Sequence, residues 1–138
     1  MVRPSKDEYY LEIAKAVSAR STCIRRHYGA VVVNKDEIVS TGYNGSIRGG
    51  INCYDLNDCP RKSLPHNSGD YSLCRGVHAE QNAVISAARR DMLGGDLYLF
   101  GVEDGQDIEN VEPCPICRKM IHNAGIKRVI TKKGIIEI

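Results

Sequence analysis

Two short segments, far apart in the sequence, constrain the fold of this chain more than any other feature. They are His78-Ala79-Glu80 and Pro113-Cys114-Pro115-Ile116-Cys117. Each alone is weak, because a His-x-Glu pair occurs on many solvated helices and a Cys-x-x-Cys pair can be a redox pair or half of a structural zinc site. Together they offer one imidazole and two thiols, the usual number of protein ligands in a catalytic zinc site. We therefore expect a fold that brings His78, Cys114 and Cys117 around one Zn²⁺.

The residues beside the two thiols predict how a helix presents them. Proline suits the first position of a helix because its φ is fixed and it lacks an N–H group, so we expect Cys114 as the N-cap of a helix over 115–124. Cys117 then lies one turn further along, where both sulfurs can face one ion. The positive end of the helix dipole also favours thiolates at this place.

Glu80 is the candidate catalytic residue. We expect a helix over 77–90 with a small apolar face, which places His78 and Glu80 in its first turn. A carboxylate beside a zinc-coordinated water can take a proton from that water and later donate it to the leaving group. A non-catalytic zinc scaffold is an alternative from another class. Glu80 weighs against it, because a structural site needs no proton carrier.

The order of the expected elements indicates the α/β class. They are a first helix opened by a capping box at Ser5–Glu8, strands 29–33 and 38–43, a long loop over 45–75, a helix over 77–90, a strand over 96–102, a helix over 115–124, and strands 128–131 and 135–138. This order predicts a three-layer α/β/α fold with a central mixed five-stranded sheet. The crossover helix makes its two flanking strands parallel, and the tight turn at 132–134 makes the last strand antiparallel.

The bulk properties set outer limits on function. At 138 residues the chain fits a single domain over 1–138. Its net charge is +2 and its basic residues are scattered, so we expect no nucleic-acid polymer as a partner. No apolar run reaches the length of a signal-peptide core or a membrane span, so we expect no membrane partner and a cytoplasmic location. Cysteines in that compartment indicate metal ligands or free thiols.

With these motifs in place, the sequence resembles the cytidine deaminase superfamily and, within it, the deoxycytidylate deaminases. The similar segments, within a likeness that covers most of residues 5–131, are Gly29-Ala30-Val31-Val32-Val33, Gly42-Tyr43-Asn44-Gly45-Ser46-Ile47-Arg48-Gly49-Gly50 and Val77-His78-Ala79-Glu80-Gln81-Asn82-Ala83. The resemblance implies a cytidine deaminase-like fold, one catalytic Zn²⁺ and assembly into a homo-oligomer. It also implies the reaction, the zinc-dependent hydrolytic deamination of a cytosine nucleotide, and we expect dCMP as the substrate and dUMP as the product.

The resemblance further implies two contacts to this small-molecule nucleotide. Asn44 is expected to bind a sugar hydroxyl, because its amide can both donate and accept a hydrogen bond. The alternative is a plain turn, since Asn-Gly favours positive φ. Arg48, in the same segment, is the candidate for the phosphate, with a solvent-exposed arginine as the alternative.

Four cysteines lie outside the catalytic motif: Cys23, Cys53, Cys59 and Cys74. They can be ordinary buried thiols. Some deoxycytidylate deaminases carry a second, structural zinc in this region, and the resemblance places Cys23 and Cys53 where its ligands lie. We therefore expect a second, structural Zn²⁺ held by the four thiolates, with His66 as a substitute if one of them is not a ligand.

Some features of the sequence leave substrates other than dCMP as alternatives. Residues 103–112 are strongly acidic and lead into the metal-binding helix, so we expect them near the mouth of the site. There they would repel a polyanion. They would also disfavour a phosphate on the substrate unless Arg48 or the segment 25–27 compensates their charge. The chain also has Glu112 where relatives have Ser, and it lacks the helix that follows the fourth strand in relatives. The alternative activity is deamination of an uncharged nucleoside or base, such as cytidine, deoxycytidine, cytosine or guanine.

Overall fold

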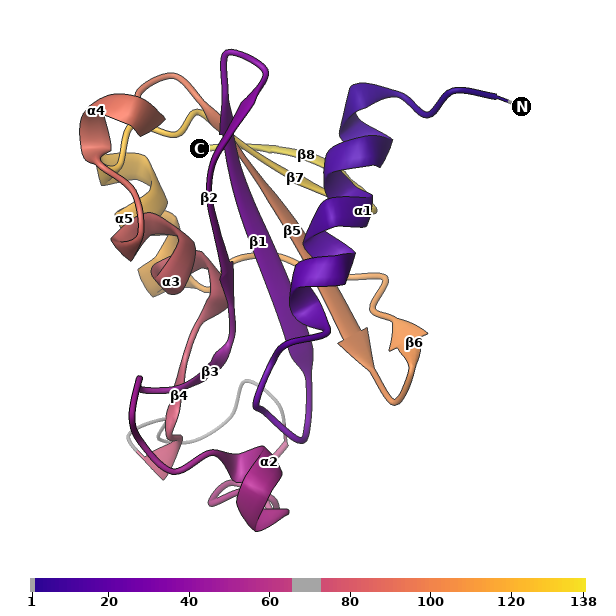
Figure 1. Ribbon diagram of the computed structural model, residues 1–138, viewed down its shortest axis with the longest axis vertical. Helices are drawn as coiled ribbons and strands as arrows, with labels where there is room; N and C mark the ends of the chain where they lie inside the picture. Colours follow the sequence, from indigo (N-terminus) through magenta and orange to yellow (C-terminus); the bar gives the residue numbers. More distant parts are fainter. Residues whose placement is uncertain (1, 66–72) are drawn as a thin grey trace.

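The computed structural model describes residues 2–65 and 73–138 (Figure 1). The helices are α1 (Lys6–Ser18), α2 (Cys53–Leu56), α3 (Ala79–Ile85), α4 (Arg89–Met92) and α5 (Pro115–Asn123). The strands are β1 (His27–Asn34), β2 (Glu37–Tyr43), β3 (Gly45–Ser46), β4 (Gly76–Val77), β5 (Asp96–Glu103), β6 (Gln106–Asp107), β7 (Arg128–Thr131) and β8 (Gly134–Glu137). None of the helices in the described part of the chain has the length and apolar character needed to cross a membrane.

The main sheet is mixed, as the sequence predicts. Its strands follow the order β2-β1-β5-β7-β8, and the short β6 pairs with β5 outside this path. β5 and β7 are parallel and are connected through α5, whereas the other pairs of this sheet are antiparallel. The parallel unit and the antiparallel last strand expected from the sequence are therefore confirmed.

Helices cover both faces of the sheet, which confirms the three-layer α/β/α fold. α1 lies on one face, and α3, α4 and α5 lie on the other (Figure 1). Successive side chains of a strand point to opposite faces. In β1, Ala30 and Val32 accordingly pack with α3 and α5, whereas Val31 and Val33 pack with α1. β1 is thus buried from both sides.

α1 begins at the capping box that the sequence predicts. The backbone N–H of Glu8 donates to Ser5 Oγ at 3.1 Å, and the backbone N–H of Ser5 donates to Glu8 Oε1 at 3.2 Å. Tyr10 is buried against the sheet. The hydroxyl of Tyr98 in β5 donates to Asp7 Oδ1 at 2.6 Å, so a polar contact also ties the start of the helix to the central strands.

The single helix expected over 77–90 is wrong, because the segment forms the two short helices α3 and α4. At its start, Val77 pairs with Gly45 in the small β3–β4 sheet, and His78 is extended with φ −70° and ψ 153°, so α3 begins one residue later. Ala88 is extended in turn before α4. Tertiary pairing and a backbone break therefore override the helical propensity of this alanine-rich segment.

The long loop expected over 45–75 contains β3 and α2. The pairing of β3 with β4 places the segment that follows β2 directly beside the residues that lead into α3. The backbone N–H of Tyr54 in α2 donates to the carbonyl of Thr22 at 2.9 Å, which ties this region to the residues before β1. Figure 1 shows these elements at the end of the sheet where β1 starts and where β4 leads into α3.

α3 lies close to β2 because Gly42 has no side chain. A Cβ atom at this position would overlap the backbone of Ala79 and Ala83. Ser40 lies on the same face of β2, and its hydroxyl donates to the carbonyl of Ala83 at 2.6 Å. These contacts set the height of α3 above the sheet, and with it the position of the side chains at the start of the helix.

Gly42→Ala should therefore lower the free energy of unfolding by about 1–3 kcal/mol, because the added methyl group meets rigid backbone. Urea denaturation measures this change. Gly76→Ala is the matched control, since its Cβ would meet its nearest neighbour, Cys74 Sγ, at an ordinary 3.4 Å. Equal stability of the two variants would contradict the close approach of α3 to β2.

Candidate metal centre

One imidazole and two thiols meet where α3 and α5 begin. The Nδ1 atom of His78 lies 3.7 Å from Cys114 Sγ and 3.4 Å from Cys117 Sγ. All three ligand atoms lie within 4.8 Å of one another, and no other cluster of three or more such residues occurs among residues 2–65 and 73–138. The fold thus brings together the three side chains that the sequence selects.

The spacing of these atoms fits a tetrahedral zinc ion. Zn–S and Zn–N bonds of ordinary length at a tetrahedral angle place the nitrogen and a sulfur about 3.6 Å apart. The two observed separations, 3.4 and 3.7 Å, lie on either side of this value. Three ligands leave the fourth tetrahedral position to a water or a substrate.

Local backbone structure holds each ligand in place. Cys114 is the N-cap of α5 and its sulfur accepts the backbone N–H of Cys117 at 3.4 Å, while Pro115 occupies the first turn. His78 is the N-cap of α3, and its backbone N–H donates to Gln81 Oε1 at 2.8 Å. The predicted cap at Cys114 is confirmed. Gln81, which the sequence analysis did not single out, fixes the backbone at the imidazole.

Burial shapes the electrostatics around the ligands. Glu80 is 5% exposed, and burial raises the pKa of its carboxyl group above the ordinary value. Burial, and then the charge of Glu80, also raise the pKa of the Cys117 thiol. A divalent cation acts in the opposite direction on both groups, because it stabilises the thiolate and the carboxylate. The donor set therefore suits a cation.

The sequence also matches a known family. The sequence model of the cytidine and deoxycytidylate deaminase zinc-binding region matches residues 4–133. The chain belongs to this family. It is 40% identical over 140 residues to the deoxycytidylate deaminase of Mycobacterium phage D29, a match that covers 96% of this chain and 98% of the phage protein. It is 35% identical to the deoxycytidylate deaminase of Schizosaccharomyces pombe, covering 93% of this chain but 37% of the yeast protein.

Solved structures of such proteins share the fold. The crystal structure of dCMP deaminase from the cyanophage S-TIM5 in complex with dCMP and dUMP is 30% identical, with a TM-score of 0.67 over 95% of this chain and 83% of that chain. Cytidine deaminase from Mycobacterium leprae, at 18% identity, has a TM-score of 0.55 over 97% of this chain and 94% of that chain. The predicted cytidine deaminase-like fold is therefore confirmed.

In this deaminase four of the five carboxylates of the acidic segment 103–112 are paired with basic side chains. The ion pairs are Arg26–Glu103 at 2.7 Å, Lys15–Asp107 at 3.3 Å, Lys132–Glu109 at 3.0 Å and Arg118–Glu112 at 3.7 Å. Lys15 belongs to α1, on the face of the sheet opposite α3 and α5, and Asp107 also pairs with Lys132 at 3.5 Å. Arg26 belongs to the segment 25–27 that the sequence offered as compensation, whereas Lys15, Arg118 and Lys132 were not foreseen as partners.

The amide of Asn44 already holds the backbone of the segment before β1. Its Nδ2 donates to the carbonyl of Arg26 at 2.9 Å, and its Oδ1 accepts the backbone N–H of Tyr28 at 2.8 Å. Each amide atom keeps one further hydrogen-bonding position for a sugar hydroxyl. The alternative of a plain positive-φ turn is wrong, because neither Asn44 nor Gly45 has positive φ.

The arginine side chains that could bind a phosphate differ in their exposure and in their hydrogen-bond partners. Arg48 is exposed in the turn at 48–50. Arg25 donates hydrogen bonds from Nη1 and Nη2 to the carbonyls of Arg61 and Leu64 at 3.0 and 2.9 Å. Its guanidinium is therefore bound to the backbone of the loop before residue 66. Arg26 is held by Glu103. Of these arginines, Arg48 has the most exposed side chain for an anionic group.

The four remaining cysteines are free thiols. Cys53 and Cys59 are buried, Cys23 and Cys74 are half-buried, and no three of the four form a ligand cluster within the described residues. Cys74 Sγ accepts the backbone N–H of Gly76 at 3.3 Å, and Arg75 Nη1 donates to Cys53 Sγ at 3.6 Å. His66 lies outside the residues that the structure describes, so the second metal site stays a prediction.

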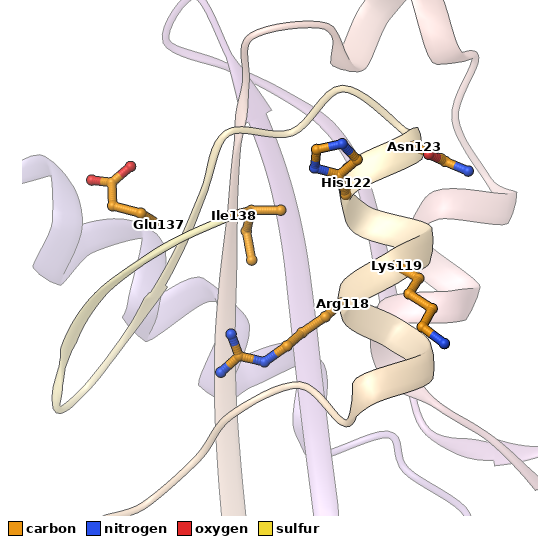
Figure 2. A pocket seen from close by; sticks show the side chains of 6 residues that line it. All are labelled: Arg118, Lys119, His122, Asn123, Glu137 and Ile138. Atoms are coloured by element: carbon orange, nitrogen blue, oxygen red, sulfur yellow. The ribbon is translucent and has the colours of Figure 1, made fainter.

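Two surface hollows lie apart from the ligand group. The first, of about 490 Å³, runs along the outer side of α5 beside the C-terminal strand (Figure 2), lined by Arg118, Lys119, His122, Asn123, Glu137 and Ile138. The second, of about 470 Å³, is lined by Cys23, Ile24, His27, Tyr54 and Asn57. Neither is lined by His78, Cys114, Cys117 or Glu80, although Cys23, a candidate ligand of the second zinc, lines the second hollow.

Proposed function

We propose that this chain hydrolyses dCMP to dUMP and ammonia with the aid of zinc. The observation that carries the proposal is the meeting of His78, Cys114 and Cys117 beside a buried carboxylate, Glu80. Membership of the zinc-binding deaminase family supports it. So does the near full-length likeness to a phage protein named deoxycytidylate deaminase. One water is consumed, its oxygen replaces the amino group of the base, and the nitrogen leaves as ammonia.

In this proposal His78, Cys114 and Cys117 hold the catalytic zinc. Zinc at this site would lower the pKa of a coordinated water to about 7 and so supply a nucleophile near neutral pH. The two thiolates balance the charge of the cation, and the N-caps of α3 and α5 keep the three ligand atoms in register. The fold therefore fixes the geometry before any substrate arrives.

Glu80 moves the protons. It takes one from the attacking water, passes it to the ring nitrogen beside the amino-bearing carbon, and then helps to protonate the departing amino group. Burial raises the pKa of Glu80, which suits a group that must be proton acceptor and proton donor in one turnover. Its side chain is nearly closed to bulk water, so these transfers take place in a site of low dielectric.

A phosphate on the substrate fits the observed charges. The acidic segment 103–112 is compensated by basic partners, so it presents less repulsion than its sequence indicates. Arg48 is exposed and is assigned the phosphate contact, while Asn44 is assigned the sugar. Deamination of an uncharged nucleoside or base is the alternative.

Assembly and the second zinc belong to the same proposal. A homo-oligomer is supported by several large apolar side chains that are more than 60% exposed, namely Ile47, Ile51, Tyr54, Ile85 and Ile116. A structural zinc at Cys23, Cys53, Cys59 and Cys74, with His66 as a substitute, would anchor the segment that precedes α3. A cytoplasmic location and a single domain over 1–138 likewise stay predictions.

Metal analysis separates the two zinc sites. The purified protein should hold two zinc ions per chain, and Cys117→Ser and Cys53→Ser should each remove a different one, because each removes a thiolate from a different ligand set. Only the Cys117 variant should also lose activity outright. One zinc per chain that persists in Cys53→Ser would exclude the structural site, and a full complement in Cys117→Ser would exclude the catalytic one.

Glu80→Gln should keep the zinc and the fold and lower kcat by about 10²–10⁴-fold or more, because both proton transfers need the carboxylate. Steady-state kinetics with dCMP, alongside zinc content and melting temperature, measure this. Glu12→Gln, an exposed carboxylate on α1, is the control and should behave as the wild type. Wild-type turnover in the Glu80 variant would remove this residue from the mechanism.

Arg48→Ala should lower kcat/KM for dCMP about ten- to a hundredfold, since a charge-assisted hydrogen bond contributes about 1.5–3 kcal/mol. Turnover of deoxycytidine, which has no phosphate, should change little. Arg90→Ala, another exposed arginine, is the control. Equal losses for the two substrates would rule out a phosphate contact, and equal handling of both by the wild type would favour the nucleoside alternative.

A further inference from the structure

Tyr28 is the first residue of β1 on the face of the sheet that α3 and α5 cover. Its side chain packs, with those of Ala30 and Val32, in the core cluster that contains Ala79 and Cys117. It therefore lies on the α3 and α5 side of the sheet, at the end where β1 starts and α3 begins (Figure 1).

The fold makes room for this ring. Tyr28 pairs with Gly101 of the neighbouring strand β5. A Cβ at Gly101 would lie 2.7 Å from Cε1 and 2.9 Å from Cδ1 of Tyr28, so any side chain there would displace the ring. The ring thus lies flat across β5, and glycine opposite it is required for that position.

The backbone that carries the ring is fixed on both sides. Asn44 accepts the N–H of Tyr28 with its Oδ1 and donates its Nδ2 to the carbonyl two residues earlier, at Arg26. The backbone N–H of Asn44 also donates to the carbonyl of Tyr28 at 3.3 Å. The segment that is assigned to the sugar therefore positions Tyr28 as well.

The hydroxyl group is oriented by a charged pair. Arg26 Nη1 donates to the hydroxyl oxygen of Tyr28 at 3.2 Å, and Arg26 Nε donates to Glu103 Oε2 at 2.7 Å. The hydroxyl hydrogen has no acceptor within the described residues, so it is free to donate. Burial raises the pKa of Tyr28 above its ordinary value, although Arg26 lowers it, so the hydroxyl keeps its proton.

We infer that Tyr28 is a substrate-positioning residue whose hydroxyl, oriented by Arg26, donates a hydrogen bond to the nucleotide that is held beside Glu80. This inference rests on the proposed function. Because Glu103 balances the charge of Arg26, the group that faces the substrate is a neutral donor. A neutral donor suits an uncharged acceptor, such as a base carbonyl or a sugar oxygen, rather than the phosphate.

Kinetics of Tyr28→Phe test this assignment, because phenylalanine keeps the ring and removes only the donor. KM should rise about 2- to 10-fold for dCMP and by the same factor for deoxycytidine, with kcat within about twofold, as expected for a neutral hydrogen bond made equally in ground and transition states. Calorimetry of dUMP binding to the zinc-loaded protein should show the same factor. Tyr9→Phe, on the opposite side of the molecule in α1, is the matched control.

The role of Arg26 is tested in a double-variant cycle. Arg26→Gln should raise KM in the wild-type background and add nothing in the Tyr28→Phe background, because it acts through the hydroxyl. An unchanged KM in Tyr28→Phe, or a full Arg26 effect that persists without the hydroxyl, overturns the inference and leaves the proposed function standing. A wild-type protein that turns over no cytosine nucleotide overturns both.

Discussion

The approach of one imidazole nitrogen to two cysteine sulfurs, at 3.4 and 3.7 Å, depends on how closely two helices meet the same face of a sheet. α3 reaches this position because Gly42 lets its backbone lie against β2. α5 lies beside α3 because it connects the parallel strands β5 and β7 and crosses the same face of the sheet. The positions of the ligands follow from the two helices, since His78 and Cys114 are N-caps and Cys117 lies in the first turn of α5.

Burial of Glu80 changes the proton affinity of the carboxylate beside the ligands. Glu80 lies beside the ligands, nearly excluded from water, where burial raises its pKa and where a cation would oppose that shift. Around this interior the surface charges are paired, notably Arg26 with Glu103. Tyr28, whose hydroxyl accepts a hydrogen bond from Arg26, packs on the same face of the sheet, against the cluster that contains Ala79 and Cys117.

Much of this arrangement can be predicted from the sequence because it depends on local rules. Proline after Cys114 marks the helix start, and the capping box at Ser5–Glu8 marks α1. The late start of α3 within 77–90 could not be predicted, because it depends on the pairing of Val77 with Gly45, a contact between segments far apart in the chain. Most partners of the acidic segment 103–112 were missed for the same reason, since Lys15 lies on α1, Arg118 on α5 and Lys132 after β7.

The central claim is that this metal centre deaminates a cytosine nucleotide. Ammonia release by the zinc-loaded protein, measured across dCMP, CMP, deoxycytidine, cytidine, cytosine, guanine and adenosine, tests it most directly. The structure and the family lead us to expect the highest kcat/KM with dCMP, with the release lost on removal of the metal. Release from guanine or adenosine alone, or none from any cytosine compound, would contradict the account.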